Sequence, residues 1–292
     1  MRSVTFRCFD PHRGPLQLWE WTYATLLIEN DWGEKCTGLL VGRKVSDTYD
    51  YQIFLVSNKH ALPRESNRRE GVSEITLHCN IRGPNGKTLG EAVPLPLHFD
   101  NGCRIWREHR DSDVDMMAFD VTSLIVEGKM PWRFAAYLDF VDKEKLEEMD
   151  ITIADDVFVI GYPSGLTQGT ANLPIVRSGI IATRIGEPFV DEVEEDRVIR
   201  PRTVRGFLID GATIPGSSGS PVVLKPEWGR GAKATYHTTT YTDKRAPALL
   251  LRIVAETLYA SVKTRYQDIV SFAGLGLAFD AQTIKETIAL FF

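Results

Sequence analysis

The clearest chemical pattern in the sequence lies between residues 209 and 224, IDGATIPGSSGSPVVL. Its core, Gly216 to Pro221, comes just before a short apolar run. Glycine allows the backbone to turn so that successive N–H groups point into one concavity, where they can stabilise a developing negative charge. Ser218 would present its hydroxyl to the same point. The pattern indicates a nucleophilic serine, and the alternative is a Gly/Ser-rich hairpin turn without catalytic function.

A serine nucleophile needs a base, and His60 follows directly on the apolar run YQIFLVS at residues 51–57. The imidazole must in turn be oriented by an acceptor that fixes its tautomer. Asp115 opens the apolar run Met116 to Phe119, which would bury its carboxylate beside a core. Taken singly, His60 could be a structural histidine and Asp115 a turn cap. The order His60, Asp115, Ser218 favours a catalytic triad.

Five segments of the chain, in this order, resemble those of trypsin-like serine proteases, and most closely the HtrA (DegP-like) protease domain. LVSNKHAL (55–62) resembles a strand ending in Thr-Asn-x-His-Val, and DVDMMAFDV (113–121) resembles Asp-Leu-Ala-Val-Leu-Lys-Val. VFVIGYPSGL (157–166) is similar to a strand ending in Ile-Gly-x-Pro-x-Gly. IDGATIPGSSGSPVV (209–223) resembles the nucleophile segment, and GLGLAFDAQTIKETI (274–288) resembles Gly-Ile-Gly-Phe-Ala-Ile-Pro followed by the closing helix. The resemblance spans Tyr23 to the C-terminus.

The resemblance implies an all-β chymotrypsin-like fold of two six-stranded antiparallel β-barrels, with the active site in the cleft between them. His60 and Asp115 would come from the first barrel and Ser218 from the second. Backbone N–H groups of Gly216 and Ser218 would form the oxyanion hole. The implied activity is that of a serine endopeptidase, which needs no cofactor and no metal and takes a protein or peptide substrate.

Substrate preference is predicted from the position six residues before the nucleophile, which lies at the base of the pocket in this family. Ala212 stands there, followed by Thr213 and Ile214, and no aspartate is present to attract Lys or Arg. We therefore expect a small or medium apolar side chain at the cleavage point. The predicted strand that contains Ile253, Val254 and Ala255 would also shape this pocket.

The sequence departs from the family pattern at three positions near these motifs. Ser220 stands where glycine is usual, and Ser217 where Asn or Asp is usual. Ala61 follows the histidine, so the disulfide that extracellular trypsins form there cannot form, although Cys36 lies near the expected position of its partner. A side chain at Ser220 could alter how the loop packs.

The elements that would position these residues are mostly strands, because short apolar runs are bounded by Gly, Pro, Asn or Asp. Helical spacing occurs at 140–149, with Asp142 as a cap, and after a second cap, Asp280. We predict a first barrel at 1–135, a linking helix at 136–150, a second barrel at 151–280 and a C-terminal helix at 281–292. The acidic segment 187–196 and the polar segment 225–247 are predicted surface loops. Trp19, Trp21 and Tyr23 alternate at strand spacing and predict one packed strand face.

Composition limits the class of protein and its partners. The 292 residues are 43% hydrophobic with a formal charge of -5, so no basic field favours nucleic acid or an anionic membrane. No apolar run approaches the length of a membrane span. Four cysteines without a CxxC pair suit a reducing compartment, and we expect a cytoplasmic protein.

The sequence argues against one alternative interpretation and leaves two others open. His78, Cys79, His98, Cys103 and His109 are residue types that bind zinc, but their spacing fits no compact zinc motif, so we expect no metal site. The chain could instead be a noncatalytic module with a protease fold. It could also be a latent protease that becomes active when an activating partner orders its loops.

Overall fold

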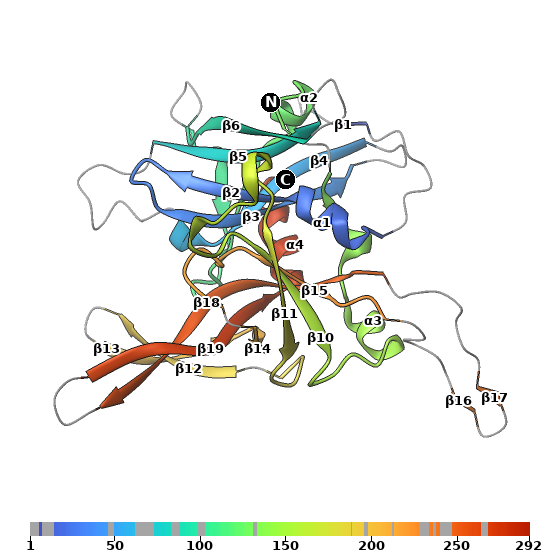
Figure 1. Cartoon of the computed structure of the whole chain (residues 1–292), viewed down its shortest axis with the longest axis vertical. Coiled ribbons are helices and arrows are strands. Elements are labelled where there is room, and N and C mark those ends of the chain that lie inside the picture. The colour runs from blue at the N-terminus through green and yellow to red at the C-terminus, as the bar shows by residue number, and fades with distance from the viewer. Residues whose placement is uncertain are drawn as a thin grey trace.

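The computed structural model describes residues 6–7, 15–45, 50–61, 73–82, 88–98, 103–130, 133–187, 189–195, 198–211, 213–227, 234–235, 238–239, 247–263 and 268–292 (Figure 1). These residues fold into two β-structures, one in each half of the chain, with few helices. The expected all-β class is confirmed.

The first half forms one nine-stranded sheet. Seven strands follow the order β6-β5-β2-β3-β4-β8-β7, while β1 pairs with β4, and β9 pairs with β3 in parallel. The strands are β1 (Phe6–Arg7), β2 (Thr25–Asn30), β3 (Lys35–Lys44), β4 (Asp50–Ser57), β5 (Glu74–Arg82), β6 (Thr88–Pro96), β7 (Trp106–Glu108), β8 (Met117–Asp120) and β9 (Ala135–Ala136).

The two edge strands of this sheet, β6 and β7, are joined by short contacts at one place. His98 and Arg104 form an isolated antiparallel bridge, and the Ile105 amide donates to the Leu97 carbonyl at 3.1 Å. Residues beyond the end of β6 thereby pair with residues just before β7. The first half is therefore a rolled sheet with seven strands in its path, where the sequence predicted a six-stranded barrel. The additional strand is the short β7, which pairs with β8.

The second half is the predicted six-stranded antiparallel barrel. The barrel is closed in the order β10-β11-β14-β19-β18-β15. The strands are β10 (Asp156–Gly161), β11 (Ile175–Ile181), β14 (Gly206–Asp210), β15 (Pro221–Leu224), β18 (Leu250–Lys263) and β19 (Asp268–Asp280). Figure 1 shows β18 and β19 continuing beyond the barrel as a long two-stranded ribbon.

Two segments predicted as loops contain strands instead. Within the acidic segment 187–196, β12 (Phe189–Glu195) pairs with β13 (Val198–Val204) over seven residue pairs. Within 225–247, β16 (Ala234–Thr235) pairs with β17 (Thr238–Thr239). Phe189 and Val190 at the start of β12, and Val193 between its acidic residues, have a high β-propensity that the predicted loop did not take into account.

Both predicted helices are present, with the predicted caps. The linking helix α3 (Lys143–Glu148) begins after Asp142, whose side chain accepts from the Lys145 amide. The C-terminal helix α4 (Ala281–Ala289) begins after Asp280, whose side chain accepts from the Gln282 amide. Further helical elements are α2 (Thr122–Val126) and the 3₁₀ turns η1 (Lys59–Ala61), η2 (Tyr137–Asp139), η3 (Pro163–Gly165) and η4 (Gly169–Ala171).

The predicted strand face of Trp19, Trp21 and Tyr23 is wrong, because these residues lie on a helix, α1 (Leu18–Ala24). The Glu20 carboxylate accepts from the Gln17 amide at 2.9 Å, which stabilises the first turn. Trp21 is fully buried, and its indole N–H donates to the Ala248 carbonyl at 2.9 Å. These contacts outweigh the local β-propensity of the aromatic residues.

Strand β4, which precedes His60, packs against a hydrophobic core on each of its two faces. Phe54 and Val56 belong to a core that also contains Ile253 of β18 and Ile284 of α4, whereas Ile53 and Leu55 belong to the core of the first sheet. Alternate residues of a strand point to opposite faces, so β4 is held on both sides. In Figure 1, α4 lies between the first sheet and the barrel.

Candidate active site

The structure brings His60 and Asp115 into direct contact. His60 lies in η1, immediately after β4, and its Nδ1 is 2.5 Å from Asp115 Oδ2. The second carboxylate oxygen accepts from the His60 backbone amide at 3.2 Å. Because an ionised carboxylate can only accept, the imidazole donates from Nδ1, which leaves the Nε2 lone pair free to take a proton.

The His60–Asp115 pair is fixed by neighbours on the same loop. Asn58 is fully buried, and its side-chain amide donates to the Asp115 carbonyl at 2.7 Å. Lys59 Nζ donates to the Asp111 carbonyl at 3.0 Å. These contacts tie the end of β4 to the segment that precedes β8.

The charge state of His60 follows from opposing effects. Partial burial lowers its pKa, while the hydrogen bond that His60 donates to Asp115 and the negative charges of Asp115 and Glu256 raise the pKa by more. The net pKa lies above the ordinary value of 6.5. The ring side chain remains about half exposed, so it is open to a substrate.

The segment around Ser218 leaves two backbone donors without an acceptor. Ser217 N donates to Ile214 O at 3.0 Å, Gly219 N to Val254 O at 2.8 Å and Ser220 N to Ser217 O at 3.0 Å. Within the described part of the chain, the Gly216 and Ser218 amides donate to no protein group. An oxyanion hole requires such a pair of free N–H groups, here the amide of the nucleophile itself and that of the residue two positions before it.

Two glycines in this segment are required by its geometry. Gly216 has a φ of 87° and Gly219 a φ of 84°, both in the left-handed region that glycine adopts readily. A Cβ on Gly219 would lie 1.8 Å from the Thr37 carbonyl oxygen and 2.9 Å from Ser57 Oγ. A Cβ on Gly216 would lie 2.5 Å from the Tyr162 carbonyl oxygen. The turn therefore packs against β3 and the end of β4 with no room for a side chain.

Ser218 itself is half-buried, and its position is fixed through the backbone. Its carbonyl accepts from the Thr37 amide of β3 at 2.8 Å. The next residue, Gly219, adjoins Ser57, three residues before His60. The structure thus brings the Ser218 segment beside the strand that ends at His60. The Ser218 hydroxyl forms no hydrogen bond with His60 or with any other described residue.

The comparisons with known proteins concern the fold. No family model and no curated protein matches the chain. Among solved structures, the active form of the Rv3671c protease from M. tuberculosis matches with a TM-score of 0.50 and 13% identity, over 93% of this chain and 82% of that chain. The chain has the chymotrypsin-like fold.

Two further solved structures are similar to the chain. The inactive form of Rv3671c matches with a TM-score of 0.47 and 13% identity, over 96% of this chain and 98% of that chain. Human heparin binding protein matches with a TM-score of 0.46 and 11% identity, over 92% and 91%. The match to the active form of Rv3671c confirms, as a likeness of fold, the resemblance found in the sequence motifs.

Thr37 is a site residue that the sequence analysis missed. Thr37 is fully buried in β3. Its hydroxyl donates to the Gly216 carbonyl at 2.9 Å and accepts from the Tyr162 amide at 3.1 Å. The Ser220 hydroxyl donates to the same oxygen at 3.3 Å. One donated and two accepted bonds use the full capacity of a threonine hydroxyl. A polar residue within the otherwise apolar run TGLLVG was the available sequence signal.

The unusual Ser220 fits because of a compensating glycine. Its side chain is fully buried, and a Cβ on Gly161 of β10 would lie 1.9 Å from Ser220 Oγ. The space left by Gly161 accommodates the hydroxymethyl group that the family usually lacks at position 220. The departure noted in the sequence therefore adds a hydrogen bond to Thr37 instead of displacing the loop.

The other unusual residue, Ser217, is held by an arginine that the sequence analysis also missed. Arg177 of β11 donates from Nη2 to Ser217 Oγ at 2.7 Å, and the Ile214 amide donates to the same oxygen at 3.3 Å. Burial lowers the pKa of Arg177. Ser217 lies between Gly216 and Ser218 in the chain. The Arg177 guanidinium therefore contacts the residue that separates the two free amides.

The predicted specificity residues have different environments. Ala212 lies outside the described residues. Thr213 is fully buried and donates from its hydroxyl to the Leu275 carbonyl at 2.9 Å, and Ile214 is half-buried. The side chains of Ile253, Val254 and Ala255 lie in hydrophobic cores. Any substrate contact from this part of β18 would therefore come from its backbone.

The segment that carries Asp115 is also anchored to α4. His109 Nε2 lies 3.0 Å from a Glu286 carboxylate oxygen, and Arg205 donates to both Glu286 oxygens at 2.8 and 2.9 Å. The Arg205 hydrogen bonds, together with those of His109, lower the pKa of Glu286 to about 2 against a smaller opposing effect of burial.

The residues weighed as zinc ligands have other partners. His78 Nε2 lies 2.9 Å from a Glu29 carboxylate oxygen, and Cys79 is buried in the core of the first sheet. Among the described residues, no three His, Cys, Asp or Glu side chains gather in a way that could hold a metal ion.

Proposed function

We propose that the protein is a serine endopeptidase that cleaves peptide bonds through an acyl-enzyme. The observation that carries the proposal is the pairing of an exposed, Asp115-bound His60 with a glycine turn in which the Gly216 and Ser218 amides have no acceptor. A buried or packed loop normally satisfies its backbone donors, so two free N–H groups beside one serine favour a catalytic function. The chymotrypsin-like fold is consistent with this chemistry.

The proposed mechanism assigns one step to each group. Ser218 Oγ attacks the scissile carbonyl carbon, and His60 Nε2 takes the hydroxyl proton and later gives it to the leaving amine. Asp115 orients the imidazole and stabilises the imidazolium ion. The Gly216 and Ser218 amides donate to the oxyanion of the tetrahedral intermediate, at about 2.7–4 kcal/mol per donor in comparable sites. Water then releases the acyl group by the same steps in reverse order.

The proposed substrate is a protein or peptide with a small or medium apolar residue on the N-terminal side of the cleaved bond. The support for this preference is the uncharged segment Ala212 to Ile214. A peptide library digested with the purified protein should show cleavage after residues such as Ala, Val or Leu. Cleavage chiefly after Arg would refute the preference but not the activity.

The activity itself is tested by comparing proteome digests with the wild-type protein and with Ser218→Ala. New peptide termini, measured by mass spectrometry, are expected with the wild type only. Ser123→Ala, an exposed serine on α2, serves as the matched control and should cleave like the wild type. Equal numbers of new termini with Ser218→Ala would show that the serine does not carry the reaction.

A second candidate function is a latent protease, since the Ser218 hydroxyl is not hydrogen-bonded to His60. Catalytic hydrogen bonds often tighten only when substrate binds. In this case an activating partner or peptide would align the two side chains. Cleavage that appears only after a cell lysate or a peptide pool is added would favour latency over constitutive activity.

We also propose a cytoplasmic location and a protein partner, not nucleic acid or membrane. Among the described residues, the buried thiols of Cys36 and Cys79 form no disulfide, which supports a reducing compartment. No helix in the described part of the chain has the length and apolar character needed to cross a bilayer. Fractionation of cells that produce the protein would test the location directly.

A further inference from the structure

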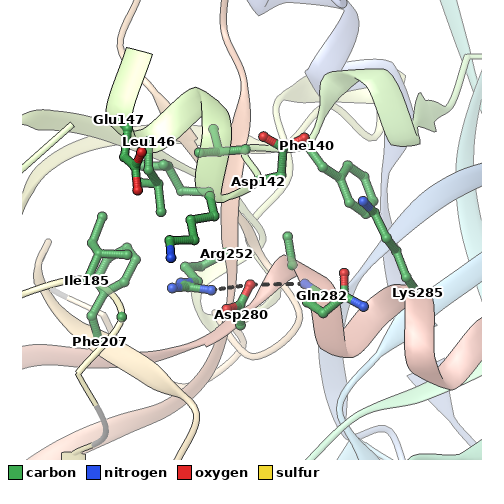
Figure 2. Close-up of a pocket in the computed structure, with 15 residues that line it drawn as sticks. Phe140, Asp142, Leu146, Glu147, Ile185, Phe207, Arg252, Asp280, Gln282 and Lys285 are labelled. Carbon is green, nitrogen blue, oxygen red and sulfur yellow. Dashed lines mark hydrogen bonds and ion pairs between the residues drawn. The ribbon is translucent and has the colours of Figure 1, made fainter. Parts of the chain in front are cut away.

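A cavity of about 580 Å³ lies between the linking helix, the start of α4 and one end of the barrel (Figure 2). It contains none of His60, Asp115 and Ser218 in its lining. Phe140, Leu146 and Phe207 are among its apolar walls. Its volume lies within the range of about 300–1,000 Å³ that small-molecule sites occupy. The cavity is therefore separate from the candidate active site and large enough for a ligand.

The most buried charge in the lining is a cation, Arg252 of β18. Arg252 is 4% exposed, and burying a charge is costly unless it is paired and hydrogen-bonded. Its Nη1 forms an ion pair with Asp280, and its guanidinium lies over the Phe207 ring at 5.0 Å. Its Nε has no hydrogen-bond partner within the described residues. Figure 2 shows the guanidinium between the Phe207 side chain and Asp280.

The Asp280 carboxylate interacts with a second donor besides Arg252. The same carboxylate oxygen that pairs with Arg252 also accepts from the Gln282 amide at 3.0 Å, at the start of α4. A guanidinium carries five N–H donors, so one shared carboxylate leaves much of its capacity unused. A second carboxylate from a ligand would complete its hydrogen bonding.

A further cation lines the cavity on the α4 side. Lys285 Nζ lies 5.3 Å from the Tyr137 ring centre and 5.7 Å from that of Phe140. Among the described residues it has no carboxylate partner. The acidic residues Asp142 and Glu147 also line the cavity, but both are exposed to solvent. Arg252 is thus the most buried charge of the lining, its partner Asp280 is partly exposed, and the remaining acidic residues lie where water screens them.

We propose that this cavity binds a small amphipathic carboxylate, with the acid group on Arg252 and an apolar chain among Phe140, Leu146 and Phe207. A carboxylate matches the geometry of the guanidinium and forms the stronger, charge-assisted hydrogen bonds. The apolar walls favour a hydrocarbon chain for the rest of the ligand. The proposal is independent of the proposed protease activity, because binding can be measured without it.

The test is calorimetric titration of the full chain with butanoate, hexanoate, octanoate and the neutral 1-octanol. Affinity should rise about fourfold for each methylene that enters the cavity. Octanoate should bind at least about tenfold more tightly than 1-octanol, because only the acid pairs with Arg252. Equal affinities for octanoate and 1-octanol, or no binding of octanoate, would overturn the proposal.

Two variants locate the ligand. Arg252→Met should weaken octanoate binding at least about tenfold and leave 1-octanol unaffected, while Leu146→Trp should block both by filling the cavity. Arg107→Met, an exposed arginine of β7, is the control and should bind like the wild type. If Arg252→Met fails to fold because Asp280 loses its partner, Leu146→Trp decides alone. Unchanged octanoate binding in Leu146→Trp would place the ligand elsewhere and refute the assignment.

Discussion

Replacing Thr37 by valine tests how the first sheet controls the nucleophile loop. Valine keeps the volume and β-branching of threonine but removes the hydroxyl. The Tyr162 amide, which is fully buried, then loses its acceptor, at a cost of about 1–3 kcal/mol. The Gly216 carbonyl also loses its donor, but this residue is half exposed and water can replace the bond at smaller cost. We expect the free energy of unfolding to fall by about 2 kcal/mol.

The same change should slow the reaction at Ser218. Without the hydroxyl, the Gly216 peptide is no longer held, so its amide spends less time in the oxyanion position. Complete loss of an oxyanion donor costs about 100-fold to 1,000-fold in rate, and a loosened donor should cost less, about tenfold. The assay is the rate of labelling by a fluorophosphonate probe, measured alongside urea unfolding.

The matched control is Thr287→Val in α4. Thr287 is also fully buried, and its hydroxyl donates to the Thr283 carbonyl at 2.7 Å within the helix. Its removal leaves no buried amide without an acceptor and lies away from the loop. The control should label like the wild type. If Thr37→Val also labels at the wild-type rate and keeps its stability, the Thr37 hydroxyl does not position the loop.

Three other predictions follow from the described contacts. Asp115→Asn should lower the pKa of His60 measured by NMR titration, because Asp115 raises that pKa. The same change should slow labelling by about 10⁴-fold, because the amide favours the wrong imidazole tautomer. An unchanged His60 pKa would show that Asp115 does not interact with His60. Gly219→Ala should lose labelling and unfold at lower urea, because its Cβ would collide with the Thr37 carbonyl and its φ is left-handed; wild-type stability would contradict this geometry. Because the Glu286 pKa is lowered from 4.5 to about 2, Glu286 stabilises the fold above pH 4.5, and this stability is lost as the pH falls toward 2. Urea unfolding of Glu286→Gln should therefore show a deficit at pH 7 that shrinks by pH 3, and a constant deficit would exclude this linkage.

The parts of the fold that the sequence predicted are those with local signals. Asp142 and Asp280 cap α3 and α4 through hydrogen bonds to amides two or three residues away. The glycine turn at 216–219 depends on left-handed backbone, which its residue types allow. His60 and Asp115 each lie at the end of an apolar strand segment, where periodicity is informative.

The parts that the sequence missed depend on distant partners. Trp21 lies in a helix because it packs in the core and bonds to Ala248, 227 residues away. Thr37 acts on a carbonyl 179 residues away, and Arg177 on a hydroxyl 40 residues away. No local pattern contains such pairs. Only the presence of a polar residue inside an apolar strand indicated that Thr37 had a partner.

The central claim is that Ser218 is activated by the His60–Asp115 pair. The most direct measurement is peptide mapping by mass spectrometry after reaction with a fluorophosphonate probe. We predict a single phosphonyl adduct on the peptide that contains Ser218, absent in Ser218→Ala and formed far more slowly in His60→Ala. An adduct on another serine, or equal labelling of the wild type and His60→Ala, would contradict the claim.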